Sequence, residues 1–395
     1  MIFDIKYYII AFMKDQSKVI ADEFENRLRE KRQALGLSQK QLAAMAGMTR
    51  QAVCAVEANQ YHPATPVALH LARALHCRVE DLFSIKCGGE IVEGELLGRV
   101  PRPGYNLRAR VTQIGNRLLV RPLDGAGDLV SLTASADGLI VGVDPKNKRV
   151  KVRLLKNREL VRRQVVIGGC DPAMFLASEH IGKHDKDSLV PCLMGSSIAL
   201  GALKRGEIHA AGIHLIDGRS GDWNLDDLKR GLGDMDYRVV TFGHWQEGIM
   251  VRQGNPKKLR NVRDFTRAGV KIVNREKGSG ARRLLDAQLD TNGIAAPRVK
   301  GYIDEVWSHL EVASRIKLGL VDAGVGVRAA AAIYGLDFIP LQRERYDLVI
   351  PTAHFESLQG LRTFLDLIVS KSFRDELEAL GGYDTRESGR IVSTS

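Results

Sequence analysis

Apolar side chains between residues 25 and 83 recur at intervals of three and four, the spacing that places them on one face of a helix. Polar capping residues and glycines divide this stretch into short segments. Ser38, with Gln41 three positions later, has the pattern of a capping box, and Thr49 has the pattern of a second helix cap. The pattern predicts helices over residues 26–35, 39–46, 50–58 and 67–75, followed by a short turn at 79–83.

The helices predicted over residues 39–46 and 50–58 are separated by a tight turn, for which Gly47 supplies the backbone freedom. Two helices joined by a short glycine-containing turn, inside a unit of short helices, form a helix-turn-helix. The sequence therefore predicts an all-α helix-turn-helix domain over residues 25–83.

Residues 84–165 alternate basic and apolar side chains, the period of a strand with one buried and one solvent face. We predict a small β-rich connector, with strands at 107–111, 117–122 and 149–154 and turns at 125–127 and 144–147. Its basic face has two interpretations. A solvated linker sheet that packs on the next domain is favoured over a second surface that contacts phosphates.

From residue 166 onward, strand-like runs alternate with helix-like runs, as in parallel sheets covered by helices on both faces. Interruptions near residues 245–256 and 335–350 suggest two lobes joined by paired crossovers. We therefore predict a two-lobed α/β domain over residues 166–383. The polar residues 384–395 show no pattern, and we predict a flexible tail there.

The composition fits this multi-domain organisation. With 395 residues, 44% hydrophobic and 27% charged, the chain suits two or three globular domains, and disordered and fibrous classes are excluded. It has no uncharged apolar run of the ~18 residues that a membrane helix needs, so no membrane partner is expected. The five cysteines show no CxxC spacing, which predicts a reducing compartment, no disulfide framework and no metal site.

The net charge of +11 is unevenly distributed along the chain. Residues 25–83 carry +3 and residues 84–165 carry +8, whereas residues 166–395 carry only +1. A basic front part on a nearly neutral module is typical of a protein that binds nucleic acid. The alternative is that these Lys and Arg residues only solubilise a surface.

Residues 1–24 form an N-terminal extension whose apolar stretch is interrupted by Asp4 and Lys6. The stretch lacks the basic start and the small-residue cleavage site of a signal peptide. It is either a short helix that packs on a partner or an artefact, with Met13 rather than Met1 as the true start.

One set of positions runs through the whole predicted helical domain: Arg29, Gly36, Leu37, Ser38, Gln39, Leu42, Ala43, Gly47, Val53, Val56, Glu57, Pro63, Leu71, Ala72, Leu75, Leu82 and Phe83. With these residues the segment resembles the phage-repressor (Xre/Cro) DNA-binding domain. The sequence departs from that pattern at Asn59, where glycine is usual. Asparagine tolerates the same left-handed turn.

The resemblance implies that the helix beginning at Arg50 lies in the major groove of double-stranded operator DNA. Arginine there can pair with guanine and glutamine with adenine, and Gln39 at the start of its own helix would meet a phosphate. Domains of this type usually bind as dimers on two half-sites. The DNA-binding candidates are Gln39, Thr49, Arg50, Gln51, Cys54 and Ala55.

Two strand-to-helix junctions of the α/β domain are rich in glycine and serine. One comprises residues 194–197 and the other residues 273–282, with Gly278, Ser279 and Gly280 at its centre. Free backbone N–H groups, hydroxyls and the helix dipole make such a junction suited to an anion. Either one alone is readily explained as a helix cap, but one in each lobe favours a ligand site. The second junction matches neither a phosphate-binding P-loop nor a dinucleotide fingerprint.

Further motifs are spread over residues 166–350: Gly169-Cys170-Asp171, Gly195-Ser196, the run 211–217, Gln246-Glu247-Gly248, the run 254–257, Asn274-Arg275, the run 278–286, Gly301-Tyr302, His309, Ala313 and Gly324-Val325-Gly326. With them the segment resembles the periplasmic-binding-protein-like (type II) domain of bacterial regulators and molybdopterin-biosynthesis fusions, related to molybdate and tungstate receptors. Cys170 and Ala281 stand where serine and threonine are usual, so two hydroxyls that could face an oxyanion are missing.

This resemblance implies a ligand between the lobes, which close on binding. The ligand-binding candidates are Asp171, Ser196, Ser197, His214, Arg275, Gly278, Ser279, Gly280 and Arg282. Arg282 has the alternative of pairing with Asp286 at i+4, and His214 and His309 have the alternative of being structural. No nucleophile–base–acid set is present, so no catalytic residue is predicted, and no cofactor is expected beyond an oxyanion effector.

Together these features predict a cytoplasmic, ligand-responsive transcriptional regulator that binds operator DNA as a homo-oligomer, in the simplest case a dimer. Its expected effector is a small oxyanion, with molybdate or tungstate favoured. Two alternatives remain. The protein is an enzyme acting on a pterin or a phosphorylated metabolite, or it is a DNA-binding protein whose C-terminal domain only dimerises.

Overall fold

A computed structural model describes residues 24–85, 89–101, 107–123, 134–184, 187–215 and 224–394. The chain separates into two compact units, one carrying the helical domain near the N-terminus and one carrying the two-lobed α/β domain. The predicted extension 1–24, the choice between Met1 and Met13 and the turn at 125–127 lie outside the described residues, apart from Phe24. Among the described helices, none is long and apolar enough to cross a membrane.

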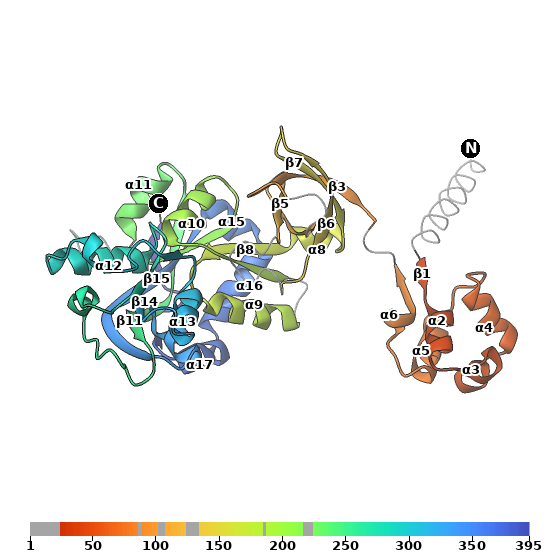
Figure 1. Cartoon of the computed structure of the whole chain (residues 1–395). Coiled ribbons are helices and arrows are strands. Elements are labelled where there is room, and N and C mark those ends of the chain that lie inside the picture. Colours follow the sequence, from red (N-terminus) through yellow and green to blue (C-terminus); the bar gives the residue numbers. More distant parts are fainter. Residues whose placement is uncertain are drawn as a thin grey trace. The chain divides into compact units, whose positions relative to one another are not determined.

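The helical domain has the predicted order of short helices (Figure 1). A two-stranded antiparallel sheet that the sequence did not reveal joins its two ends, since β1 pairs with β2. The elements are β1 (Phe24–Asn26), α2 (Leu28–Ala34), α3 (Gln39–Ala46), α4 (Arg50–Glu57), α5 (Thr65–Ala74), α6 (Val79–Leu82) and β2 (Phe83–Ile85).

The capping pattern of this domain is present as predicted. The Ser38 hydroxyl accepts from the Gln41 N–H at 3.2 Å while the Gln41 amide accepts from the Ser38 N–H at 2.8 Å. Thr49 accepts from the Ala52 N–H at 3.1 Å, which starts α4. Asn59 adopts a positive φ of 56°, the left-handed turn expected in place of glycine.

A buried ion pair fixes the packing of α2 against α4. The Arg32 guanidinium donates to Glu57 at 2.6 and 3.1 Å and to the Leu37 carbonyl at 2.6 Å. The side chains of Arg32 and Glu57 are only 10% and 4% exposed. A charge buried this deeply is costly when it loses its partner, so the pair holds the two helices in one register.

The connector is a closed five-stranded barrel, in which the order of the strands is β3-β5-β4-β6-β7. Its strands are β3 (Ile91–Leu96), β4 (Arg108–Ile114), β5 (Arg117–Pro122), β6 (Gly138–Asp144) and β7 (Arg149–Leu154), and the helix α8 (Arg158–Arg162) follows. Along β7 the basic side chains are exposed and the apolar ones buried, which is the predicted alternation. Closure removes the sheet edges that an open linker sheet would expose.

The barrel contacts the α/β domain, as the favoured interpretation of the connector expects. Arg117 donates to the carbonyl of Arg205 at 2.8 Å, and an Arg121 N–H lies 3.3 Å from the sulfur of Cys192. Part of the basic surface of the barrel is therefore used within the protein.

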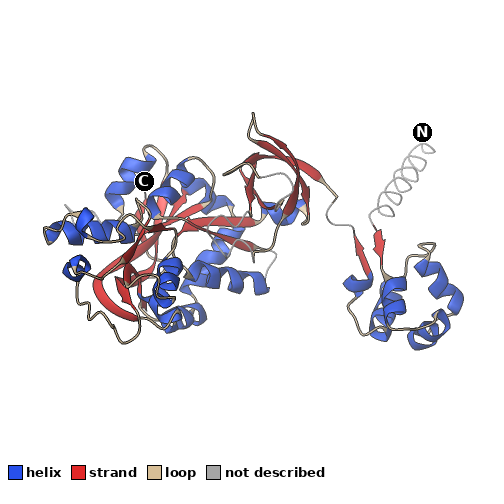
Figure 2. Ribbon diagram, viewed as in Figure 1, coloured by secondary structure: helices blue, strands red, loops and turns tan. Residues whose placement is uncertain are grey.

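The α/β domain is built on a ten-stranded sheet, flanked by helices in Figure 2, with the main order β13-β12-β14-β11-β15-β10-β8-β9. Strands β8, β9 and β10 are parallel neighbours in the first lobe, and β12, β13 and β14 are parallel neighbours in the second. The strands are β8 (Gln164–Gly169), β9 (Ser188–Leu193), β10 (Ala210–Ile213), β11 (Tyr237–Val251), β12 (Ile272–Arg275), β13 (Glu305–Val306), β14 (Ala323–Val327) and β15 (Asp337–Pro351).

Helices cover this sheet as the alternation predicted. They are α9 (Ala173–His184), α10 (Ser196–Lys204), α11 (Leu225–Leu232), α12 (Gly280–Thr291), α13 (His309–Lys317), α14 (Arg328–Ile333), α15 (Thr352–Ser357), α16 (Gln359–Val369) and α17 (Lys371–Ala379), with 3-10 helices at Val262–Thr266 and Ala296–Arg298. The segment 262–266 is a 3-10 helix rather than an α-helix, and the helix expected over 305–318 begins only at His309, after β13.

The two lobes are joined by a pair of long antiparallel strands, β11 and β15. The sequence interpretation placed breaks at 245–256 and 335–350, whereas β11 continues unbroken to Val251 and β15 runs unbroken from Asp337. The paired crossover itself is present. The first break is present only from residue 252 onward, in the turn that follows β11. Residues 245–251 and 337–350 lie in strands, because polar residues that look like loop are held in the ladder by their partner strand.

The predicted flexible tail is also wrong. Residues after 382 form β16 (Tyr383–Asp384) and β17 (Ile391–Thr394), and both strands pair with β11. The Tyr383 hydroxyl donates to Asp171 at 2.5 Å and the Ser388 hydroxyl donates to the carbonyl of Phe242 at 2.5 Å. These polar side chains have partners far away in the sequence, which a local pattern does not reveal.

We expect the Glu57→Ala substitution to destabilise the helical domain by about 3 kcal/mol, because it leaves the Arg32 guanidinium buried without its counter-charge. Urea-dependent hydrogen exchange of peptides from residues 24–85, in the full chain, measures this. The matched control is Glu80→Ala, which removes an exposed carboxylate of the same domain and should cost under about 0.5 kcal/mol. Equal losses for the two variants would contradict the role of the buried pair.

Candidate DNA interface and interlobe site

Helix α4 presents the predicted base-reading residues on its outer side. Val53 and Val56 are fully buried and fix the inner face of α4 on the core of the helical domain. The residues of the outer side are Thr49, Arg50, Gln51 and Cys54, all exposed, and Ala55, half-buried. Among these described residues the side chains of Arg50 and Gln51 make no contact that would withdraw them from a duplex.

The side chain of Gln39, which we expected to face a DNA phosphate, is instead bonded within the protein. Its amide N–H donates to Glu57 at 2.9 Å, so this side chain is part of the Arg32–Glu57 cluster. The start of α3 is still exposed, but the amide is turned toward α4 rather than outward to a phosphate.

The two glycine–serine junctions of the α/β domain come together, although they lie some eighty residues apart. Ser197, at the start of α10, donates its hydroxyl to the Gly278 carbonyl at 2.9 Å. A methyl group added at Gly195 would lie 3.2 Å from the Cβ of Ser279. The lobes are thus in direct contact through the two helix starts, and Ser196 and Ser279 are fully buried.

The serine hydroxyls at this contact already have partners within the protein. Ser196 accepts from the backbone N–H of His214 at 3.2 Å. Ser279 donates to the Glu276 carbonyl at 2.9 Å and accepts from the Arg282 N–H at 3.3 Å, which caps α12. In this closed arrangement the hydroxyls join the loops and cap helices, and a ligand would have to compete with these bonds.

The two predicted arginines have different surroundings. Arg282 follows its alternative interpretation: it pairs with Asp286 at 3.1 Å and with Glu305 at 2.8 Å, and it lies 4.3 Å over the ring of Tyr302. These contacts hold the guanidinium on the second lobe, where it also donates to the Arg275 carbonyl at 3.3 Å.

Arg275 is fully enclosed between the lobes. Two of its nitrogens are bonded to Glu276 at 2.8 and 3.0 Å, and one of them also to the Trp307 carbonyl at 3.1 Å. Its third nitrogen, Nη1, is buried and has no hydrogen-bond partner among the described residues.

His214 is the centre of the polar cluster between the lobes. Its Nδ1 lies 2.6 Å from Glu344 and 3.6 Å from Glu247, and its Nε2 lies 3.1 Å from the sulfur of Cys170. The ring of Trp245 packs edge-on against the imidazole, and the centres of the two rings are 4.8 Å apart. Added side-chain atoms at Gly280 would overlap this imidazole, so only a glycine lets the second lobe approach so closely.

Burial controls the protonation of this cluster. It raises the pKa of Glu247 well above its usual range and raises the pKa of Glu344 to about 7. It lowers the pKa of His214 to about 4, and the pKa of His309 falls well below its usual value. At neutral pH the His214 imidazole is therefore uncharged, and burial beside Glu344 favours the protonated form of Glu247.

One oxygen of Asp171 is bonded within the fold, and the other, Oδ2, is buried without a hydrogen-bond partner among the described residues. Oδ1 accepts from the Ala173 N–H at 2.8 Å, at the start of α9, and from the hydroxyl of Tyr383. Burial raises the pKa of Asp171 to about 6. The residue thereby ties the C-terminal segment to the first lobe.

Glu247, Glu344 and Trp245 were missed as site residues. They lie on β11 and β15, in stretches that the sequence interpretation treated as breaks. The motif containing Glu247 carried the family resemblance without indicating a role. Nothing in the local pattern shows that the two glutamates face one histidine, because the long strands alone bring them there.

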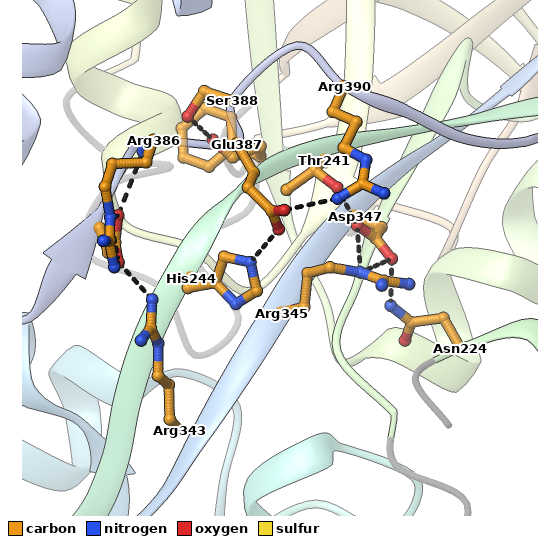
Figure 3. Close-up of polar contacts among 12 residues, drawn as sticks. Asn224, Thr241, His244, Arg343, Arg345, Asp347, Arg386, Glu387, Ser388 and Arg390 are labelled. Atoms are coloured by element: carbon orange, nitrogen blue, oxygen red, sulfur yellow. Dashed lines mark hydrogen bonds and ion pairs between the residues drawn. The ribbon is translucent and has the colours of Figure 1, made fainter. Parts of the chain in front are cut away.

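The C-terminal segment also contacts the hinge strands β11 and β15, and Figure 3 shows Glu387 turned toward His244. Glu387 pairs with His244 at 2.8 Å, and Asp384 pairs with Arg386 and Arg343. A surface cavity of about 510 Å³ lies beside them, lined by His244, Arg343, Asp384, Arg386 and Glu387. None of these lining residues belongs to the cluster around His214.

Comparison with known families agrees with this architecture. A helix-turn-helix family model matches residues 28–82, and the model of the PBP superfamily domain matches residues 178–369. The chain thus combines an Xre-type helix-turn-helix domain, as found in transcriptional regulators, with a periplasmic-binding-protein-like domain.

Related sequences cover both parts of the chain. YvgK of Bacillus subtilis is 34% identical over 231 residues, which are 58% of this chain and 74% of YvgK. A Clostridium pasteurianum protein from the 5′ region of a 2Fe-2S ferredoxin gene is 40% identical over 111 residues, 28% of this chain and 97% of that protein. An HTH-type transcriptional regulator of Methanothermobacter thermautotrophicus is 44% identical over 57 residues, 14% of this chain and 83% of the regulator. The chain belongs to the family that includes YvgK, with an Xre-type DNA-binding domain at its front.

Solved structures are similar to the α/β domain at low identity. An ABC-type phosphate transport receptor from Vibrio cholerae has 15% identity and a TM-score of 0.36, covering 55% of this chain and 98% of the receptor. The effector-binding domain of QuiR, in complex with shikimate, has 14% identity and a TM-score of 0.37, covering 52% of this chain and 95% of that domain.

We expect Gly280→Ala to open the interlobe contact, because the added methyl group would overlap the His214 imidazole. Overpacking of this kind costs about 1–3 kcal/mol. Hydrogen exchange should become faster in residues 195–198 and 276–282, and the melting temperature should fall. Gly182→Ala, at a helix glycine with open space around it, is the control and should change neither quantity in that direction. Unchanged exchange in Gly280→Ala would show that the lobes do not depend on this contact.

Proposed function

We propose that this protein is a cytoplasmic transcriptional regulator that binds double-stranded operator DNA as a homodimer and responds to a small oxyanion held between the lobes. Molybdate and tungstate are the favoured effectors. The regulator class follows from the family and the fold. The oxyanion, the dimer and the compartment are our proposals.

The observation that best supports an oxyanion ligand is the unbonded guanidinium nitrogen of Arg275. This Nη1 is buried between the lobes without a partner among the described residues, and a buried donor of a charged group is costly to leave unbonded. Charge-assisted bonds to an anion are among the strongest hydrogen bonds. An anion at this position would satisfy the guanidinium that Glu276 only partly occupies.

Other groups at the same contact support an anion. The starts of α10 and α12 lie together, and each contributes backbone N–H groups and the positive end of a helix dipole. The indole N–H of Trp245 is not one of these donors, since it faces the Glu344 carboxyl. The donors come from both lobes, as a site that closes on its ligand requires.

Anion binding can change the operator affinity if the open and closed states of the α/β domain bind the anion with different affinities. A ligand shifts a conformational equilibrium only by its difference in affinity for the two states. Within the described residues, β11 and β15 connect the lobes and the C-terminal strands pair with β11, so we infer that opening and closing occur about these strands. We propose that this movement changes the spacing of the two α4 helices in the dimer.

Operator binding is tested with a duplex that the full-length protein selects from a random DNA pool. We expect Arg50→Ala to weaken binding to this duplex about 10- to 100-fold, since a base-reading arginine contributes about 1–3 kcal/mol. Fluorescence anisotropy measures the affinity. Arg78→Ala removes the same charge from the start of α6 and should have little effect. Equal losses in both variants would mean that α4 does not read bases.

The effector is tested on the same duplex, with molybdate, tungstate, sulfate and phosphate added separately. We expect molybdate or tungstate to change the operator affinity by at least about fivefold, the lower range of allosteric coupling. The double variant Arg275→Gln/Glu276→Gln removes both charges of the buried pair together, and it should lose the response while it keeps its ligand-free affinity. Arg343→Gln, at the outer cavity, is the control and should respond normally. If none of the four anions changed the operator affinity, the proposal of an oxyanion effector would be refuted.

A further inference from the structure

Three side chains that bind metals in many proteins meet between the lobes. Cys170 follows β8 and His214 follows β10 in the first lobe, while His309 opens α13 in the second. One ligand atom of each lies within 4.8 Å of the others, and all three residues are buried. The sequence distances between them are far larger than in a zinc motif, so the spacing of the cysteines could not reveal this group.

His214 is held in the orientation of a metal ligand. Its Nδ1 faces the Glu344 carboxyl at 2.6 Å, and its Nε2 faces the sulfur of Cys170 at 3.1 Å. When Nδ1 carries the proton and donates it to Glu344, the lone pair of Nε2 points toward Cys170. Metal-binding histidines are commonly oriented in this way, with the second nitrogen bonded to a carboxylate.

His309 supplies an independent observation. It is fully buried, and neither of its ring nitrogens has a hydrogen-bond partner among the described residues. Buried polar atoms almost always have partners, and an exception calls for a water, an ion or a ligand that completes the site. The centres of the His309 and His214 rings are 6.0 Å apart, so a single ion or water molecule can contact both imidazoles.

We propose that the protein binds one divalent transition-metal cation of the zinc class through Cys170, His214 and His309. A thiolate with two imidazoles selects borderline or soft cations such as Zn²⁺ over Mg²⁺ or Ca²⁺, which prefer oxygen ligands. As the metal–sulfur bond forms, the Cys170 thiol loses its proton to solvent. Three protein ligands leave a fourth position open for water or a bound ligand.

The cation would join the two lobes directly. Two of its ligands belong to the first lobe and one to the second, so metal binding favours the closed arrangement over an open one. This inference does not rest on the oxyanion. It depends only on the three side chains and on Glu344, which acts as a positioning residue for His214.

The test is a titration of the full-length protein, freed of metal by a chelator, with Co²⁺ alone, in the absence of DNA and oxyanions. Bound Co²⁺ reports its ligands by absorption. We expect one Co²⁺ per chain, a thiolate charge-transfer band in the near ultraviolet and visible bands of a four-coordinate ion, all abolished by added Zn²⁺. We expect Glu344→Gln to weaken binding about 10- to 100-fold, as loss of a carboxylate behind a ligating histidine does.

Two variants locate the site. Cys170→Ser should lose the thiolate band, and His309→Gln should bind Co²⁺ at least about tenfold more weakly. The matched control is Cys192→Ser, which removes a half-buried thiol outside the cluster and should keep the full spectrum. If Cys170→Ser does not fold, as circular dichroism would show, His309→Gln alone decides the location.

The proposal is overturned if the wild-type chain shows no thiolate band, or if the band disappears in Cys192→Ser and persists in the other two variants. An anion response without Co²⁺ binding would leave the proposed function intact and refute the metal site alone. Co²⁺ binding without any anion response would support the metal site and refute the oxyanion effector alone.

Discussion

The closed form of the α/β domain depends on the close approach of His214 to Gly280. The imidazole lies at the end of a first-lobe strand, and the glycine opens a second-lobe helix, with no room for a side chain between them. Glu344 and Cys170 hold the ring from both of its nitrogens. The contact of the two loops, the burial of Arg275 and the grouping of His309 with the first lobe all require this approach.

The long strands β11 and β15 make that approach specific. They provide Glu247 and Glu344 beside His214, and they are also the paired connection between the lobes. A movement of the lobes about these strands therefore changes the surroundings of the buried carboxyl groups. The C-terminal segment reinforces the connection, because β16 and β17 pair with β11 and Ser388 bonds to its backbone (Figure 3). Binding between the lobes and the mechanics of the hinge thus involve the same few residues.

Much of the fold could be predicted from local patterns. The capping box of Ser38 and the cap at Thr49 were visible because each bond joins residues only three apart. The alternation of strands and helices after residue 166 was also visible, since each element buries its own periodic apolar face. The convergence of the two glycine–serine junctions followed from the rule that ligands of such sheets lie where strands end and helices begin. Whether these junctions bind an anion is untested, and Arg282 took its structural alternative.

The chain by itself therefore determined what short-range chemistry encodes: the helix caps, the periodicity of each element, the order of the domains and the exposed face of α4. Only the tertiary structure decided the pairing of the C-terminal residues with β11, the continuity of the hinge strands and the meeting of Cys170, His214 and His309. The physical reason is sequence distance. These contacts join polar groups more than forty residues apart, and each group looks unremarkable beside its own neighbours in the sequence. Their partners exist only after the sheet has assembled and excluded water from the space between the lobes.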